Sequence, residues 1–225
     1  MSTEHQQPLV SIDTVPFMVR DGRLYLVTAE RANEPFAGAQ ALPGVLLLPS
    51  ERLAEAALRA LTVKTGVGRE QVEHIGTAGV YDNPDRDPRG PTISIVHTAV
   101  LHPDAGLDEA TVQVVPAEQV SGLPFDHDTI LRRTAGTALD ALWVDQPLTR
   151  ALLGQRFTTA QAARLIRSLA AAAGRSEPDS SNLGRMLARS PALTKSGEAV
   201  AAGRGRPAAG WSWNQQSRRD LYSLP

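Results

Sequence analysis

The sequence predicts an α+β protein made of two parts, a mixed α/β sandwich and a small helical unit that ends in a basic hairpin. In residues 9–148, alternating apolar stretches typical of strands are interrupted by helical patterns. Residues 149–214 begin with helical patterns and end in a short strand. With 225 residues and 42% hydrophobic residues, the chain is long enough for one large and one small packed unit.

The strands of the first part are marked by apolar alternation and by turn signals. Asp21-Gly22 is a strong hairpin signal between the first two of them. Proline and glycine break the pattern in residues 31–39 and 82–90, so we expect loops there. The expected strands span residues 10–19, 23–28, 75–81, 92–101 and 112–116.

Two helices are expected in the first part, over residues 50–65 and 126–142. Ser50 is the expected N-cap of the first helix, and Gly66 ends it. The apolar face of this helix consists of Leu53, Ala57, Ala60 and Leu61. The second helix repeats apolar residues at helical spacing, namely Ile130, Leu131, Ala138, Leu139 and Leu142.

The first helix and its flanks keep the spacing of a known motif. The residues in register are Glu51, Arg59, Leu61, Gly66 and Val67. This frame resembles the Nudix box of pyrophosphohydrolases, Gly-x5-Glu-x7-Arg-Glu-U-x-Glu-Glu-x-Gly-U with U a hydrophobic residue. Val45 falls on the first glycine of the box, beside Gly44. The three carboxylates that hold the metal in that family fall on Ala60, Val63 and Lys64.

These replacements predict a site without metal ligands or catalytic residues. Mg²⁺ prefers near-octahedral oxygen ligands, and Ala60 and Val63 offer none. Lys64 puts a cation where the divalent ion would sit, which repels the ion. Such a site could still attract a diphosphate, held by Lys64 and by arginines. The plainer alternative is that residues 50–64 form only an amphipathic helix.

The charge of the chain is divided unevenly between its two parts. Residues 1–150 hold 12 Lys and Arg against 20 Asp and Glu, whereas residues 151–225 hold 11 against 4. An acidic first part and a basic last part predict that only the last part meets a polyanion, which favours nucleic-acid binding. A chance segregation of solvated charges is the alternative.

The basic part begins with two helical patterns. Thr158 and Gln161 form an expected capping box. The buried face that follows consists of Ala162, Leu165, Ile166 and Leu169. Residues 173–180 contain Gly, Pro and Ser and predict a turn, after which Ser180 or Ser181 caps a second helix. The apolar side of that helix consists of Leu183, Met186 and Leu187.

A basic hairpin completes this part. Gly- and Arg-rich residues 203–207 precede an expected strand over residues 208–213, with Trp211 and Trp213 on one face. Helix, turn, helix and basic hairpin is the order of a winged helix, whose second helix enters the major groove. The predicted DNA-contacting residues are Asn182, Arg185, Arg189, Lys195, Arg204 and Arg206. Arg185 and Arg189 could also be ordinary solvated helix arginines.

Four further segments, in the right order, make the resemblance more specific. They are Pro35-Phe36-Ala37-Gly38 before Ala41-Leu42-Pro43-Gly44, Asp85-Arg86-Asp87-Pro88-Arg89-Gly90 before Ser94, Leu123-Pro124-Phe125-Asp126-His127, and Gly205-Arg206-Pro207-Ala208. Over about residues 8–214 the chain resembles the Nudix-related transcriptional regulators of NAD metabolism. The resemblance implies a repressor of NAD synthesis or salvage genes. It also implies a homodimer that senses ADP-ribose or a related NAD breakdown product in the former hydrolase pocket.

The chain also departs from that family. An aromatic residue is usual where Gln40 stands, and a second glycine where Val45 stands. Leu183-Gly184 replaces Phe-Arg in the usual recognition helix, and Ala209 replaces an arginine in the wing. The identity of the effector and the operator sequence therefore stay open.

The effector pocket is expected where the box meets the charged loop. The predicted effector-binding residues are Phe36, Arg59, Lys64, Tyr81, Arg86 and Arg89. Guanidinium groups pair phosphate oxygens bidentately, and Phe36 or Tyr81 could stack a base or cap a ribose. Arg86 and Arg89 could equally pair with Asp85 and Asp87 within a stiff loop.

The expected organisation is a flexible N-terminus over residues 1–8, a Nudix-like effector-sensing domain over 9–148, a winged helix over 149–214 and a tail over 215–225. The chain has no cysteine, no long apolar stretch and no apolar signal core, so we expect a cytoplasmic protein without a membrane partner. The expected partners are double-stranded DNA and a small phosphorylated metabolite, and no cofactor is expected.

Two other functions stay open. A Nudix hydrolase could take metal ligands from other acidic residues, such as Glu51, Glu55, Asp82 or Asp87. Alternatively, Gln40 and Val45 are compatible with a DNA-bound adaptor whose pocket is vestigial and empty.

Overall fold

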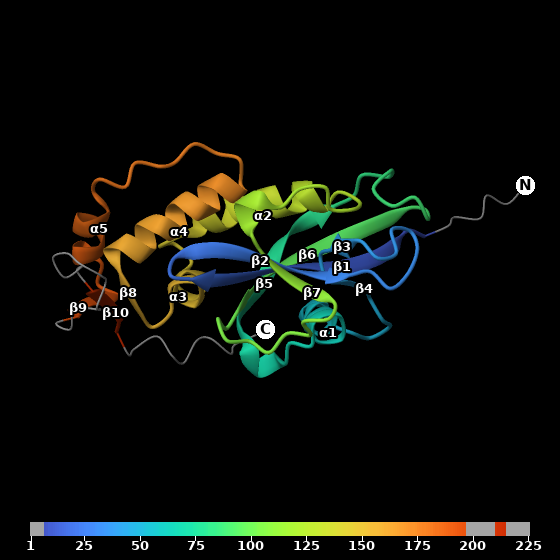
Figure 1. The fold of residues 1–225 in the computed structure, drawn as a ribbon, viewed down its shortest axis with the longest axis horizontal. Coiled ribbons are helices and arrows are strands. Elements are labelled where there is room, and N and C mark those ends of the chain that lie inside the picture. Colours follow the sequence, from blue (N-terminus) through green and yellow to red (C-terminus); the bar gives the residue numbers. More distant parts are fainter. Residues whose placement is uncertain (1–6, 197–209, 215–225) are drawn as a thin grey trace, which may run out of the picture.

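The computed structural model describes residues 7–196 and 210–214 as an elongated molecule (Figure 1). A mixed sheet runs along its middle, with α2 and α4 on one face and α1 on the other, while α5, β9 and β10 form one end. The strands are β1 Leu9–Arg20, β2 Arg23–Glu30, β3 Gln40–Ala41, β4 Gly44–Leu46, β5 Val72–Tyr81, β6 Thr92–Leu101, β7 Val112–Pro116, β8 Arg156–Thr158, β9 Leu193–Ser196 and β10 Gly210–Trp213. The helices are α1 Leu53–Thr65, α2 His127–Ala141, α3 Gln146–Leu153, α4 Thr159–Ala172 and α5 Leu183–Arg189, with 3₁₀ turns η1 Arg69–Gln71 and η2 Ala117–Gln119.

The central sheet is built around β1. Its strand order is β3-β2-β1-β6-β5, with β4 added to β1 and β7 to β2. β1 pairs antiparallel with β2 through the Asp21-Gly22 turn, in which both residues have positive φ. It pairs in parallel with β6 from Leu9 opposite Thr92 to Met18 opposite Leu101. All five strands expected in the first part are confirmed.

Alternation along β1 divides the core into two layers. Val15 and Phe17 belong to the large cluster that includes α2 and α4, whereas Met18 packs with Leu61 of α1 in a separate cluster. All four of these side chains are fully buried. A strand covered on both faces requires apolar residues on both faces, which explains the nearly continuous apolar run in β1. The predicted sandwich is thus confirmed.

The start of α1 differs from the prediction. Ser50 has a φ of 65° and lies in a turn, so it is not the N-cap. The helix begins at Leu53, and the Glu55 carboxylate accepts a hydrogen bond from the Arg52 backbone N–H at 3.1 Å. Leu53, expected on the buried face, is 36% exposed, whereas Ala56 is fully buried against Ile12 of β1.

The last part has the strand order and helices of a winged helix. β10 lies between β8 and β9, and α3, α4 and α5 precede the β9–β10 connection. The predicted capping box is confirmed, since Thr158 Oγ1 accepts from the Gln161 N–H at 3.1 Å. The Trp211 Nε1–H donates to Thr159 Oγ1 at 2.8 Å, and Trp213 packs against Phe157. Both tryptophans are buried and hold the small sheet against the helices.

Two details of this part differ from expectation or cannot be compared. Neither Ser180 nor Ser181 caps α5: Asn182 holds the N-cap position, and Ser181 donates to the Asp179 carboxylate in the preceding turn. The expected wing over residues 203–207 lies outside the described residues. The same is true of most of the expected N-terminal segment and of the expected tail.

The two parts share one core. The expected boundary between residues 148 and 149 falls inside α3, and the large buried cluster extends from Val15 to Trp213. α4 packs against α2, and the Ser168 hydroxyl accepts from the Leu24 N–H of β2 at 3.0 Å. Within the described residues, no helix is long and apolar enough to cross a membrane.

Candidate functional site

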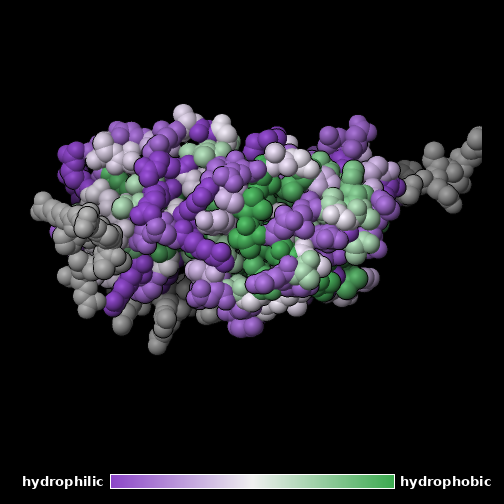
Figure 2. Space-filling view, in the orientation of Figure 1, coloured by the Kyte–Doolittle hydropathy of each residue, from purple (hydrophilic) through white to green (hydrophobic). Residues whose placement is uncertain are grey.

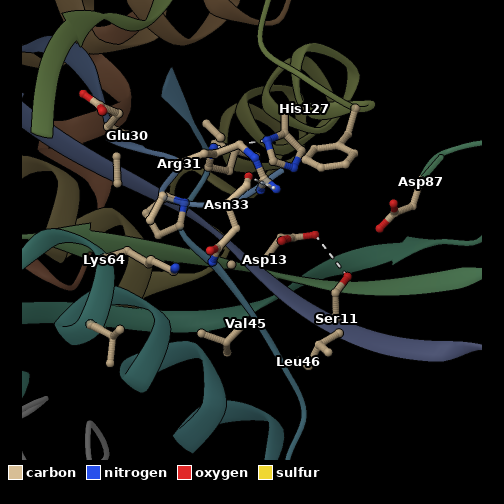
Figure 3. A pocket seen from close by; sticks show the side chains of 18 of the residues that line it. Ser11, Asp13, Glu30, Arg31, Asn33, Val45, Leu46, Lys64, Asp87 and His127 are labelled. Carbon is tan, nitrogen blue, oxygen red and sulfur yellow. Dashed lines mark hydrogen bonds between the residues drawn. The ribbon is translucent and has the colours of Figure 1, made fainter. Parts of the chain in front are cut away.

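A cavity of about 400 Å³ opens beside β1, between α1 and the beginning of α2. It contains most of the predicted effector residues. Figure 3 shows Lys64 entering from α1, with Ser11 and Asp13 of β1 across from it and His127 at the opposite side. The polar residues that line the cavity are Ser11, Asp13, Glu30, Arg31, Asn33, Arg59, Lys64, Arg86, Asp87, Arg89 and His127.

The α1 side of the cavity carries the substituted box positions. Val63 and Lys64 both line the cavity, although Val63 is 65% exposed, whereas Ala60 is fully buried. Arg59 forms a two-bond ion pair with Glu51, with its Nε and Nη2 each 2.7 Å from a carboxylate oxygen. This pair lowers the pKa of Glu51, since the hydrogen bonds stabilise the charged carboxylate. The pair therefore ties the loop that carries Glu51 to Arg59 of α1.

The acidic residues around the box do not make a metal centre. Among residues 7–196 and 210–214, no group of three or more His, Cys, Asp and Glu side chains could hold a metal ion. Lys64 and Val63 stand where a hard divalent ion would need oxygen ligands. The residues present therefore do not fit a magnesium ion at the usual place in the box.

Arg86 lies at the centre of a buried charge network. Its side chain is 3% exposed and pairs with Asp126 at 2.8 Å and with Asp13 at 3.4 Å. Ser94 completes the network by donating to Asp13 at 2.5 Å. Burial lowers the pKa of Arg86, but the bonds to Asp126 and the charge of Asp13 outweigh it, so the pKa is raised. The network ties β1 to the start of α2.

Arg89 is held differently, by its own loop. Its guanidinium pairs with the Asp87 carboxylate at 2.7 Å, which is one of the two pairings left open by the sequence. Asp87 is buried, and the bonds from Arg89 lower its pKa. The Arg89 side chain is 51% exposed, so part of its donor set faces solvent at the cavity. A bound anion can therefore reach Arg89 more readily than Arg86.

An aromatic cluster closes the same end of the cavity. The Phe125 ring lies between Arg31, whose Cζ is 4.7 Å from the ring centroid, and Arg89, at 5.9 Å. The Phe36 ring meets Phe125 edge-on, with centroids 5.1 Å apart. Burial, followed by the nearby Arg89 charge, lowers the pKa of Arg31. His127 is buried below, and its Nδ1 accepts from the Leu42 N–H at 3.1 Å.

The structure brings together four of the six predicted effector residues, Arg59, Lys64, Arg86 and Arg89. Phe36 reaches the cavity only through Phe125. Tyr81 is a correction: it lines a different cavity, because the end of β5 turns its side chain toward α2. The residues that sequence reasoning missed include Arg31, Asp13 and His127.

The opposite end of the molecule carries the predicted DNA-contacting residues. Asn182, Arg185 and Arg189 are all exposed on α5, while Leu183 and Leu187 are buried beneath them. The Arg185 guanidinium bonds the Asn182 side chain. Met186, expected to face inward, is 42% exposed. Figure 2 shows hydrophilic side chains gathered over the α4 and α5 end of this face.

The neighbouring hairpin is described in part. Lys195 is exposed on β9, opposite Trp211 of β10. Arg204 and Arg206 lie outside the described residues. Among the predicted DNA-contacting cations, the described ones are thus exposed on α5 and on β9.

Comparisons with known proteins agree with this architecture. The NUDIX domain family model matches residues 9–134. An ADP-ribose pyrophosphatase of Methanocaldococcus jannaschii is 34% identical over 128 residues, which cover 56% of this chain and 72% of that protein. The ADPR responsive transcriptional repressor NtrR of Acinetobacter baylyi is 30% identical over 139 residues, covering 58% of this chain and 54% of that protein.

Solved structures extend the likeness to both parts. Shewanella oneidensis NrtR complexed with a 27mer DNA has a TM-score of 0.70 at 22% identity, covering 91% of this chain and 93% of that one. The NUDIX domain of the same regulator complexed with ADP ribose has a TM-score of 0.51 at 27% identity, covering 59% and 89%. The first likeness establishes the fold of the sandwich together with the C-terminal unit.

Proposed function

Because this chain belongs to the NUDIX domain family, we propose that it is a DNA-binding transcriptional repressor whose Nudix cavity senses ADP-ribose or a related phosphorylated metabolite without hydrolysing it. One observation carries the proposal: Lys64 lines the cavity at a position where the family's box has a metal-binding carboxylate. Two relatives support the assignment, the ADPR responsive repressor and the ADP-ribose complex of a similar domain. The regulated genes are proposed to be those of NAD or related nucleotide metabolism.

The cavity's cations suit a diphosphate. Lys64 supplies a compact charge from α1, and Arg89 offers exposed donors from the charged loop. A guanidinium pairs phosphate oxygens bidentately, whereas an ammonium acts as a point charge. Phe36 and Phe125 form an aromatic wall at the same end, against which a base or ribose can pack. Lys64 thus takes over the charge neutralisation that Mg²⁺ provides in a hydrolase.

Arg86 connects the cavity with the DNA-binding part of the molecule. It bonds Asp13 in the cavity wall and Asp126 immediately before α2, and α2 packs against α4 of the winged helix. An anion that binds Arg86 or the charged loop of residues 82–90 changes the position of α2. The ligand must bind the DNA-competent and DNA-incompetent forms unequally, because equal affinity would shift nothing. The usual size of such coupling is about 1–3 kcal/mol.

The DNA-binding form is proposed to be a homodimer that presents two winged helices to two half-sites. Asn182, Arg185 and Arg189 on α5 read bases, because Asn and Arg have donor patterns that match base edges. The cations Lys195, Arg204 and Arg206 hold phosphates, which sets affinity and salt dependence but not sequence.

Isothermal titration calorimetry of the full chain with ADP-ribose tests the sensing site. We expect binding in the absence of Mg²⁺, weakened about tenfold or more by Lys64→Ala through loss of a charged contact. Arg69→Ala is the matched control, because Arg69 is an exposed cation on η1 outside the cavity. Equal affinity in all three proteins would remove Lys64 from the site, and no binding of any nucleotide or sugar phosphate would leave an adaptor with an empty cavity.

A hydrolase is the second candidate, and the likeness to the M. jannaschii pyrophosphatase favours it. It would need metal ligands outside the usual positions, such as Glu51 or Glu55. Glu51 is already bonded to Arg59, and Glu55 to the start of α1. Sustained Mg²⁺-dependent release of AMP from ADP-ribose, abolished by Glu55→Ala, would establish the hydrolase and refute the repressor with an inactive cavity.

A further inference from the structure

A second cavity, of about 540 Å³, lies between the edge strand β5 and α2. It contains Tyr81, which the sensing site does not use, and it is distinct from the Nudix cavity, with which it shares no lining residue. One face of α2 supplies much of its wall through residues at helical spacing, Thr129, Arg132, Arg133, Gly136 and Thr137. Arg175, which follows α4, closes the other side.

The charge of this cavity is positive. Three arginines line it, and no aspartate or glutamate is among its lining residues. Arg175 is neutralised by Asp140, at 2.7 Å. Within the described part of the chain, Arg132 and Arg133 form no ion pair, and both are exposed. The Nudix cavity, in contrast, pairs Arg86 and Arg89 with its own carboxylates.

Two contacts hold Arg133 and Arg175 in place, and the one at Arg133 leaves its charge unpaired. The Arg133 guanidinium lies over the Tyr81 ring, 5.8 Å from its centroid. A Cβ on Gly136 would be 3.3 Å from Arg175 Cζ, so the glycine lets Arg175 lie close to α2. Burial raises the pKa of Tyr81, whose side chain lines the same cavity. Thr129 and Thr137 add two hydroxyl groups to the wall.

We propose that this cavity is a second ligand site, which binds an oligophosphate group between Arg132, Arg133 and Arg175. The unpaired guanidinium groups of Arg132 and Arg133, with neighbouring hydroxyl donors, match phosphate oxygens, and Arg175 adds donors beyond its pair with Asp140. The bound group would connect α2 with the end of α4, since Arg132 and Arg133 belong to α2 and Arg175 follows α4. Such a ligand would act on the same helix pair as the Nudix cavity, but through different residues.

The test is calorimetric titration of the full chain with inorganic tripolyphosphate and, separately, with ATP. The variants are Arg132→Gln with Arg133→Gln, Lys64→Ala in the Nudix cavity, and Arg69→Gln as a surface control. We expect the double variant to lose one binding event, or to weaken it about tenfold or more through loss of two charged contacts, while Lys64→Ala and Arg69→Gln retain it. Both arginines are exposed, so the fold should be unaffected, which circular dichroism checks.

The outcomes separate the possibilities. Tighter binding of ATP than of tripolyphosphate identifies a nucleotide ligand. Equal binding identifies the phosphate chain alone as the ligand. Either outcome supports the site. An unchanged isotherm in the double variant, or phosphate binding lost only with Lys64→Ala, overturns it. Weaker DNA binding by the double variant without any phosphate binding also overturns it, and makes this face a DNA contact. ADP-ribose binding is measured separately, so failure here leaves the sensing proposal standing.

Discussion

The Nudix cavity and the α5 end both carry arginines, but they hold them in opposite ways. Arg86 is 3% exposed and bonds two carboxylates on separate elements, whereas Arg185 and Arg189 are exposed above an apolar helix face. Burying a pair of charges costs free energy because both lose their hydration, but the pair then has a defined geometry. Exposed charges are screened by salt and adapt to a flexible polyanion. Under the proposed function, the fixed charges of the cavity suit a small ligand of defined shape, and the exposed charges of α5 suit DNA.

The largest effect is expected from Arg86→Ala. Removing this guanidinium leaves Asp13 and Asp126 unpaired, and breaking a buried pair costs about 3–5 kcal/mol of unfolding free energy. Urea denaturation measures the loss. The control is Arg23→Ala, which breaks the exposed pair with Glu118 and should cost less than about 1 kcal/mol. Equal losses in the two variants would show that the Arg86 network is not a special support of the fold.

A smaller effect is expected from a substitution on α5. It should change only the preference for one DNA sequence over another. Arg185→Ala should cost about 1–3 kcal/mol of preference for the operator over a mismatched site, because Arg185 is proposed to read a base. Competition binding with matched and mismatched duplexes measures it, with Arg69→Ala as the control. A uniform loss on every duplex would instead make Arg185 a phosphate contact.

Lys195→Ala is expected to act on salt dependence. Its exposed ammonium on β9 is proposed to contact a phosphate, so the slope of log affinity against log salt should fall by about one unit. DNA titrations over a series of salt concentrations give the slope. An unchanged slope would take Lys195 out of the interface.

The smallest effect concerns pH. Burial lowers the pKa of His97 and of His127 below their ordinary value of 6.5. The unfolded chain therefore binds protons that the folded chain does not, so stability is fully present above pH 6.5 and falls as the pH drops below it. Urea denaturation at several pH values gives the free energy of unfolding at each pH. This free energy should change less steeply with pH in His97→Asn than in the wild type. His102→Asn, at an exposed position, is the control, and an equal flattening there would contradict the assignment to His97.

Local signals made the sandwich predictable. The Asp21-Gly22 turn and the apolar alternation on both sides of it fixed β1 and β2, and the Thr158–Gln161 spacing fixed the start of α4. The start of α1 was predicted wrongly because Ser50 is a good cap residue by type, but its positive φ places it in a preceding turn. Cap chemistry is a weaker guide where a proline-containing turn comes immediately before the helix.

The candidate site was predictable only where a motif carried it. Lys64 and Arg59 followed from the box frame, but the partners of Arg86 did not, because Asp13 and Asp126 are 73 and 40 residues away in the sequence. Tyr81 is predicted to stack a base or cap a ribose in the sensing cavity, whereas it lines the cavity between β5 and α2. The face of the sheet on which an aromatic residue beside a loop lies is decided by tertiary packing. The spacing of a motif carries no information about that packing.

Fluorescence anisotropy of the full chain on DNA from upstream of its own gene tests the central claim most directly. The measurement uses ADP-ribose, without Mg²⁺, at two salt concentrations. The account predicts sequence-selective, salt-dependent binding that ADP-ribose reverses in the wild type, but reverses only at higher concentration in Lys64→Ala. Selective DNA binding that no concentration of ADP-ribose or related phosphorylated metabolite alters would contradict a sensor in the Nudix cavity.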